Sequence, residues 1–339
     1  MRLLSTLLCF VLFLPLQSAA QAPAGAKPLA TVNVIAFPGA SVNLPAWVAE
    51  RQGFFTRHGV AVKLTFTPSS SYLMSNLIDG KYDIGIFGID NLVAYQEGRG
   101  EGKFTGTPDL VAFMGINPGF LHLIGTPDVK TITDLRGKQI AVDALTTGFA
   151  FVLREMIARA GMTDADVTYV RVGGSVERFR SVVTEGKQAA TLLNTPFDLQ
   201  AVDRGYTRLG SAAQLLGSYH GHGVVAQRGW IAQNEAAVLG YMRAHRDAME
   251  WLFDPKNREI VEALLVAHDR QMTPALARRT YEVFTDPKEG LFRNLAVHIE
   301  GLRTVLALRN KFSQPPLNLT DPMKYVDLDL YRKAFSPKP

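Results

Sequence analysis

The fold is indicated most directly by residues 33–91, NVIAFPGASVNLPAWVAERQGFFTRHGVAVKLTFTPSSSYLMSNLIDGKYDIGIFGIDN. Three apolar runs typical of strands, at 32–36, 60–66 and 84–87, alternate with helical segments at 45–52 and 71–78. Gly53 and Gly80 follow the two helical segments and suit helix ends. The pattern predicts β-α-β-α-β with a polar or glycine-rich turn after each strand, which is where open α/β sheets bind ligands.

A second, weaker copy of this pattern lies further along the chain. Strands are expected at 139–142, 167–172 and 189–193, and a helix at 149–160. A shift of 106 residues places Ser175 on Ser69, and a shift of 108 places Gly161 on Gly53. Few residues are identical between the two copies, which leaves chance as an alternative. The recurrence of the same order of elements nevertheless favours a duplication. The chain is therefore expected to form an α/β clamp of two lobes, each a mainly parallel sheet flanked by helices.

Residues 1–20 have the features of a signal peptide. Arg2 precedes an apolar run over 3–16, and Ser18-Ala19-Ala20 offers small residues for cleavage after Ala20. The run is short for a membrane anchor, the alternative interpretation. Residues 21–30, rich in Ala, Pro and Gly, are expected to form a disordered leader. These features indicate export to a periplasm.

The composition excludes several classes of function. Cys9, the single cysteine, lies inside the signal peptide, so the mature chain has neither disulfides nor thiol chemistry. The net charge of +5 is spread along the chain, whereas a nucleic-acid site needs a concentrated basic face. We expect no nucleic-acid partner and a monomer.

The chain is long enough for two cores. Residues 31–124 with 224–313 are expected to form lobe 1, and 125–223 lobe 2, with hinges near 125–126 and 219–223. Helical segments at 234–253, 258–268, 274–284 and 297–311 should complete lobe 1. The proline-rich residues 314–339 are expected to be a surface tail.

Catalytic motifs are missing from the sequence. It contains no G-x-S-x-G elbow, no phosphate-binding P-loop and no H-E-x-x-H. His220 and His222 form a His-Gly-His pair in a segment read as a flexible turn, which could contact a ligand or a metal. A pair without a third ligand is a weak metal signal, so we expect no metal and no cofactor.

Polar turns at the expected strand ends supply the candidate ligand-binding residues. Each alone is an ordinary helix cap, but six at matching places in two repeats favour a cleft between lobes. Phe37, Phe87, Phe149 and Tyr72 could stack on a ligand, and Asp90, Asp143 and Asp198 could accept its hydrogen bonds. The candidates are Asn43, Leu44, Ser70, Ser71, Tyr72, Gly88, Asp90, Asp143, Thr146, Thr147, Gly148, Phe149, Gly174, Ser175, Asn194 and Pro196.

Three segments resemble one known family. They are PAWVAERQGFF at 45–55, DGKYDIG at 79–85 and DLRGKQIAV at 134–142. They are similar to the periplasmic solute-binding proteins for taurine, alkanesulfonates, nitrate and thiamine-pyrimidine precursors. The resemblance implies a type II periplasmic-binding-protein clamshell that delivers a small molecule to an ABC permease with its ATPase, by peripheral docking at the membrane.

The resemblance leaves the ligand open. Ser70, Thr147 and Ser175 match the serine- and threonine-rich turns of the sulfonate and nitrate binders, whereas Asp143 and Phe149 differ from the small residues expected there. A sulfonate, a carboxylate, an aromatic acid or a pyrimidine remains possible. One alternative is a sensing protein for a membrane receptor. Another is a thiamine-pyrimidine synthase-like enzyme, although such enzymes carry a cysteine-rich motif and a cofactor lysine.

Overall fold

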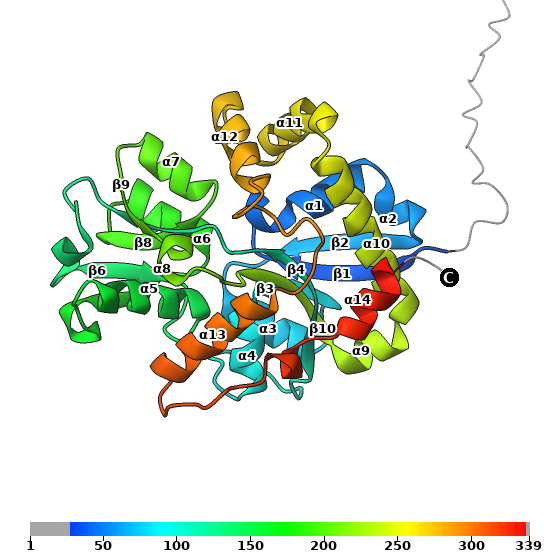
Figure 1. Ribbon diagram of the computed structural model, residues 1–339, viewed down its shortest axis with the longest axis horizontal. Helices are drawn as coiled ribbons and strands as arrows, with labels where there is room; N and C mark the ends of the chain where they lie inside the picture. The colour runs from blue at the N-terminus through cyan, green and yellow to red at the C-terminus, as the bar shows by residue number, and fades with distance from the viewer. Residues whose placement is uncertain (1–27, 337–339) are drawn as a thin grey trace, which may run out of the picture.

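The protein folds into two α/β lobes, each built on one five-stranded sheet (Figure 1). The computed structural model describes residues 28–336. The signal peptide and most of the leader expected from the sequence lie outside this range. The first sheet has the order β2-β1-β3-β10-β4 and the second β7-β6-β8-β5-β9. The strands are β1 (Ala30–Ala36), β2 (Val60–Phe66), β3 (Ile84–Gly88), β4 (Leu110–Asn117), β5 (Leu121–Gly125), β6 (Gln139–Val142), β7 (Thr168–Arg171), β8 (Ala190–Asn194), β9 (Thr207–Ser211) and β10 (His222–Gln227).

Helices cover both sheets. Those of the two repeats are α1 (Ala40–Arg51), α2 (Phe54–Arg57), α3 (Ser70–Ile78), α4 (Ile89–Gln96), α5 (Gly148–Arg159), α6 (Ser175–Phe179), α7 (Phe197–Asp203) and α8 (Ala212–Leu216). Those that follow are α9 (Arg228–Gln233), α10 (Glu235–Leu252), α11 (Arg258–His268), α12 (Pro274–Phe284), α13 (Ile299–Phe312) and α14 (Leu328–Phe335).

The two sheets have the same construction, as the repeat predicted. Strands β1, β2 and β3 are parallel neighbours, and so are β6, β7 and β8. In each sheet one antiparallel strand, β10 or β5, lies beside the third strand of the repeat. The shift of 106 residues carries β3 onto β8 end to end. The expected α/β fold of two mainly parallel sheets is confirmed.

The first crossing between the lobes lies earlier than expected. Strand β5 pairs with β8 and β9, so it belongs to the second sheet rather than to lobe 1. The chain crosses at 118–120 instead of near 125, because the Pro118-Gly119 turn leads into the second sheet and does not close a hairpin. The return crossing, 217–221, lies against it. A Cβ on Gly221 would be 2.1 Å from the nitrogen of Gly119, so this approach requires glycine.

Helix α1 begins at Ala40, five residues before the expected start at Pro45. Pro45 inside the helix cannot donate to the carbonyl of Ser41. The side-chain amide of Asn117 donates to that carbonyl in its place. The expected turn at Asn43 and Leu44 is therefore wrong, because both residues lie within the helix and are fully buried.

The C-terminal helices do more than complete the first lobe. Helix α13 packs against both α4 of the first lobe and α5 of the second, and Figure 1 shows it (orange) running beneath the junction. The expected surface tail beyond residue 314 is partly wrong. Tyr325 and Leu330 are buried, and Val326 forms a bridge with Ala112 of β4. The prolines suggested a surface tail, but the segment carries apolar residues at these contacts.

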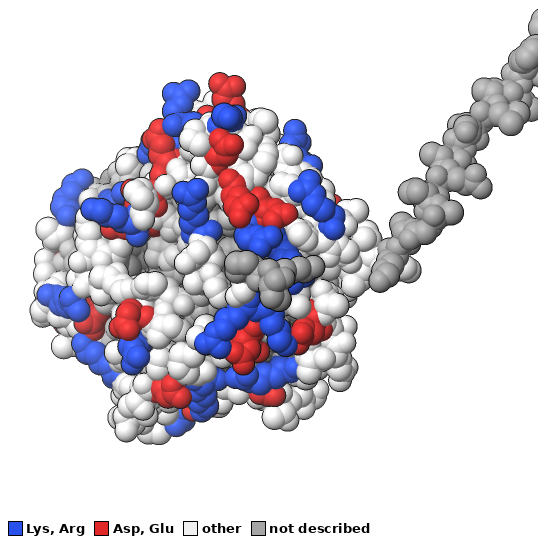
Figure 2. Space-filling view, turned by 45° about the vertical axis from the view of Figure 1, so that its right-hand side comes forward, with Lys and Arg blue, Asp and Glu red and all other residues white. Residues whose placement is uncertain are grey.

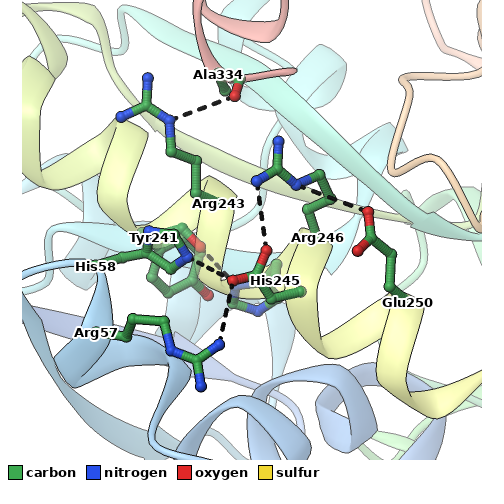
Figure 3. A network of polar contacts seen from close by, with 9 residues as sticks. Arg57, His58, Tyr241, Arg243, His245, Arg246, Glu250 and Ala334 are labelled. Atoms are coloured by element: carbon green, nitrogen blue, oxygen red, sulfur yellow. Dashed lines mark hydrogen bonds and ion pairs between the residues drawn. The ribbon is translucent and has the colours of Figure 1, made fainter. Parts of the chain in front are cut away.

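A network of charged residues joins α2 to α10 at the far side of the first lobe (Figure 3). His58 Nε2 lies 2.7 Å from an Asp247 carboxylate oxygen, and Arg246 lies 3.4 Å from the other oxygen. Arg57 approaches to 3.9 Å. These partly exposed groups hold the short helix α2 in place.

Acidic and basic side chains are interspersed on the face of the molecule shown in Figure 2. Within residues 28–336, every helix is too short or too polar to span a bilayer.

Candidate functional site

A cavity lies between the two lobes, where the carboxyl ends of β1, β3, β6 and β8 face one another. This is the place at which α/β sheets bind ligands. Both lobes line it, and α4 and α5 each begin beside it. The lining residues are Phe37, Pro38, Gly88, Asp90, Asn91, Asp143, Thr147, Gly148, Phe149, Gly174, Ser175, Arg178, Asn194 and His222.

Nine of the candidates derived from the sequence line this cavity. They are Gly88, Asp90, Asp143, Thr147, Gly148, Phe149, Gly174, Ser175 and Asn194. The structure thus brings together turns that are up to 106 residues apart in the chain, and their ligand-binding role remains a prediction.

Ser70, Ser71 and Thr146 line a smaller neighbouring hollow instead. Thr146 is occupied there, because its backbone N–H and hydroxyl both donate to Glu101, at 2.7 and 2.8 Å. The Ser70 N–H approaches a carboxylate oxygen of Asp143 at 3.5 Å. These residues join the lobes beside the cavity.

Four candidates lie away from the cavity. Asn43 donates to the carbonyls of Phe37 and Gly39, both at 2.8 Å, and Leu44 belongs to the core. Tyr72 is 48% exposed on α3, because the helix begins at Ser70 and turns its side chain outward. Pro196 precedes α7 and lines none of the hollows described.

The carboxylate of Asp90 is already engaged by an arginine. Arg309 of α13 donates to it through Nε, at 2.8 Å, and through Nη2. Nη2 also donates to the carbonyl of Thr146 in the second lobe, at 2.9 Å. Both side chains are buried, and the guanidinium lies over the ring of Phe151. The Asp90–Arg309 pair therefore joins α4 to α13 and, through Arg309, to the second lobe, and the arginine balances the carboxylate charge.

Arg178 brings an unexpected positive charge to the cavity wall. Its guanidinium donates to the carbonyls of Gly173 at 2.7 Å and Leu192 at 3.3 Å, and to the hydroxyl of Ser175 at 3.1 Å. Burial lowers the pKa of Arg178, and the charge of Asp143 opposes that effect. Burial likewise raises the pKa of Asp143, opposed by Arg178. Because Ser175 accepts from Arg178, its own O–H can be donated to a ligand.

The His-Gly-His segment is neither flexible nor exposed, contrary to expectation. His222 begins β10, and His220 is fully buried beside the return crossing. His222 lines the cavity, where Phe149 of the other lobe meets its ring edge-on, 5.5 Å between centroids. Tertiary contacts hold both histidines in place, and the glycines around them in the sequence gave no indication of these contacts. Within residues 28–336, no group of three or more His, Cys, Asp or Glu is placed to hold a metal.

The lobes are in direct contact around the cavity. A Cβ on Gly148 would lie 2.3 Å from the Asp90 Cβ, and one on Gly174 would lie 2.9 Å from Phe37. The Gly174 N–H donates to the Pro68 carbonyl at 2.9 Å. Glycine at both positions allows the lobes to close this tightly.

One known protein family matches most of this chain. The family model described as NMT1/THI5 like matches residues 41–258. The chain belongs to the NMT1/THI5-like family. The match begins at α1 and ends at the start of α11, so it includes every residue that lines the cavity except Phe37 and Pro38. The family resemblance inferred from the sequence is confirmed. A comparison with curated protein sequences gives no match.

Solved structures share the fold of this NMT1/THI5-like protein at low sequence identity. The periplasmic nitrate-binding protein NrtA from Synechocystis PCC 6803 has a TM-score of 0.74 and 16% identity, covering 90% of this chain and 88% of its own. The alkanesulfonate-binding protein SsuA from Xanthomonas axonopodis pv. citri, bound to MOPS, gives 0.66 and 17%, covering 85% and 93%. The desulfurization enzyme DSZB gives 0.60 and 14%, covering 89% and 98%. One fold therefore serves binding proteins and an enzyme.

Some lining residues of the NMT1/THI5-like protein were absent from the candidates. Phe37 was noted only as a possible stacking aromatic, and His222 as part of a turn that could contact a ligand or a metal. Pro38 and Asn91 adjoin turns that had been singled out, so a wider window would have included them. Arg178 lies one helical turn beyond Ser175, and that spacing is the signal that could have found it.

Proposed function

We propose that this NMT1/THI5-like protein is the solute-binding component of an ABC importer. It captures a small organic molecule in the cavity between its lobes and delivers it to a membrane permease with its ATPase. The lobes open and close about the crossings at 118–120 and 217–221 by a hinge motion. The export signal expected in the sequence supports a capture step in the periplasm.

The observation that carries this proposal is the cavity itself. It is enclosed by strand ends of both lobes, and its polar groups come from each lobe, so neither lobe alone would form the site. The hydroxyls and amides of Ser175, Thr147, Asn91 and Asn194 offer directional contacts, and Phe37 and Phe149 offer apolar ones. A concave, mixed site of this kind is typical of small-molecule recognition.

Thermal unfolding tests the capture of a solute. Among sulfonates, aromatic acids, carboxylates and pyrimidines, at least one compound should raise the melting temperature by mass action. The double variant Ser175→Ala with Thr147→Ala should lose this shift, while circular dichroism should show that the free protein is still folded. The control variant Thr320→Ala with Ser336→Ala removes two exposed hydroxyls and should retain the shift. Equal affinity of both double variants for the compound would disprove the assigned site.

Two further measurements separate the alternatives. A compound recovered unchanged after incubation indicates capture, whereas a converted compound indicates an enzyme, as for DSZB with its similar fold. Loss of uptake of that compound by cells without the gene indicates import, and unchanged uptake indicates sensing.

A further inference from the structure

His222 presents one ring nitrogen to the cavity, and its hydrogen bonds determine the form of that nitrogen. Nδ1 lies 2.9 Å from the side-chain oxygen of Asn117. Nε2 has no hydrogen-bond partner within residues 28–336 and is not among the fully enclosed polar atoms there. Since His222 lines the cavity, Nε2 is its polar contact with that space.

Asn117 fixes which ring nitrogen carries the proton. Its side-chain nitrogen donates to the carbonyl of Ser41, and its oxygen accepts the N–H of Gly119 at 2.7 Å. A flipped amide would place its NH₂ against that N–H and its oxygen against the carbonyl, so the orientation is assigned by the network. The oxygen can only accept, and His222 Nδ1 must therefore donate to it.

The imidazole of His222 is neutral at physiological pH. Burial, and secondarily the neighbouring His220, lowers the pKa of His222 to about 3. His220 accepts the N–H of His298 at Nδ1 and directs Nε2 to the carbonyl of His222. With its proton on Nδ1, a neutral His222 ring has an unshared electron pair on Nε2.

We propose that His222 determines specificity by offering a hydrogen-bond acceptor to the ligand, so that the cavity selects a solute with an N–H or O–H donor over an anion of the same shape. The inference rests on the proposed function and narrows its ligand class. An anion that carries only acceptors would leave Nε2 without a partner and place two electron pairs against each other, at the cost of a buried unsatisfied group.

The surrounding charges support the same choice. Asp143 is a second acceptor on the cavity wall, and among the residues that line the cavity Arg178 alone carries a positive charge to offset it. Arg309 is committed to Asp90. The wall therefore has no excess positive charge to balance an anion, whereas a neutral solute with a donor on one edge matches both acceptors. Phe149, edge-on to His222, suits a planar solute.

Nitrogen NMR of ¹⁵N-histidine protein tests the assignment without any ligand. His222 should show a protonated Nδ1 and an unprotonated Nε2 that do not titrate between about pH 5 and 8. The variant His222→Phe identifies its signals, and through-bond assignment serves if that variant fails to fold. A protonated Nε2, or a ring that titrates in this range, overturns the proposal.

Matched probes test the selection. Benzamide, benzoate and benzenesulfonate share a ring, as acetamide and acetate share a methyl group, and only the amides carry a donor. Calorimetry should show the amide of a set binding at least about tenfold more tightly than its anions. His222→Phe should abolish that preference, and His58→Gln, a change of a histidine in the distant network of Figure 3, should keep it.

Tighter binding of an anion within a set would overturn the donor selection and leave the capture of a solute intact. Absence of binding by both amides would also overturn the donor selection, and the capture of a solute would then be decided by the melting-temperature screen alone.

Discussion

Arg309 should be among the most costly side chains to remove, because its loss leaves a buried carboxylate without a counter-charge. The side chains of Arg309 and Asp90 are 0% and 3% exposed, and two hydrogen bonds join them. Breaking such a pair from one side typically costs about 3–5 kcal/mol, more than the pair's net contribution, since the remaining charge stays desolvated. Arg309→Met should lower the free energy of unfolding by about 4 kcal/mol.

Urea unfolding followed by tryptophan fluorescence and circular dichroism measures this change. Arg332→Met is the matched control, because Arg332 pairs with Asp329 at side-chain exposures of 67% and 80%. An exposed pair contributes about 0–1 kcal/mol. The double variant Arg309→Met with Asp90→Asn should recover about 2 kcal/mol relative to the sum of the single changes. A loss below about 1 kcal/mol for Arg309→Met, or strict additivity, would refute the reasoning.

Three other predictions follow from the structure. Gly148→Ala places a methyl group 2.3 Å from the Asp90 Cβ, so small-angle scattering should show a more open molecule; Gly229→Ala, with open space around it, should not differ from wild type. Glu101→Gln weakens the contacts with Thr146 and Arg171 and should open the lobes in the same assay, without lowering the melting temperature of either lobe's core. Burial lowers the pKa values of His220, His222 and His245 to about 4, 3 and 4, below the ordinary 6.5. As the pH falls below about 6.5, the unfolded chain therefore binds more protons than the folded protein does. Stability should therefore decline below about pH 6.5, by about 1.4 kcal/mol per unit for each histidine, and urea midpoints that stay level between about pH 6.5 and 4.5 would contradict this.

The sequence predicted the parts of the fold that depend on local pattern. Strands at β1, β2, β3, β6 and β8 were placed within two residues, because buried parallel strands form short apolar runs with glycines nearby. The start of α1 was missed because a proline usually signals the first turn of a helix. Inside this helix, the hydrogen bond that Pro45 cannot donate is replaced by one from the side chain of Asn117, which is distant in sequence. Strand β5 was placed in the wrong lobe because an extended segment does not specify its partner.

The site residues differ in the same way: those placed by the local strand pattern were predicted, and those that depend on tertiary packing were not. Gly88 and Asn194 end strands, Asp143 directly follows one, and Gly174 lies in the turn after β7, so locating the strands located them. The engagement of Asp90 by Arg309 depends on how α13 packs against both lobes. A helical stripe of apolar residues reveals that α13 is buried on one side but does not say against what.

The repeat explains why the two walls of the cavity differ chemically. The shift of 106 residues that aligns β3 with β8 also aligns Phe37 with Asp143 and Pro68 with Gly174, and Gly174 donates to Pro68 beside the cavity. Equivalent turns thus face each other, but their side chains have diverged. The first lobe contributes Phe37, His222 and Asp90, whose charge is balanced by Arg309, and the second contributes Phe149 together with the charged pair Asp143 and Arg178. Under the proposed function, a solute would therefore meet an acceptor and an aromatic ring from each lobe, namely His222 and Phe37 on one side and Asp143 and Phe149 on the other.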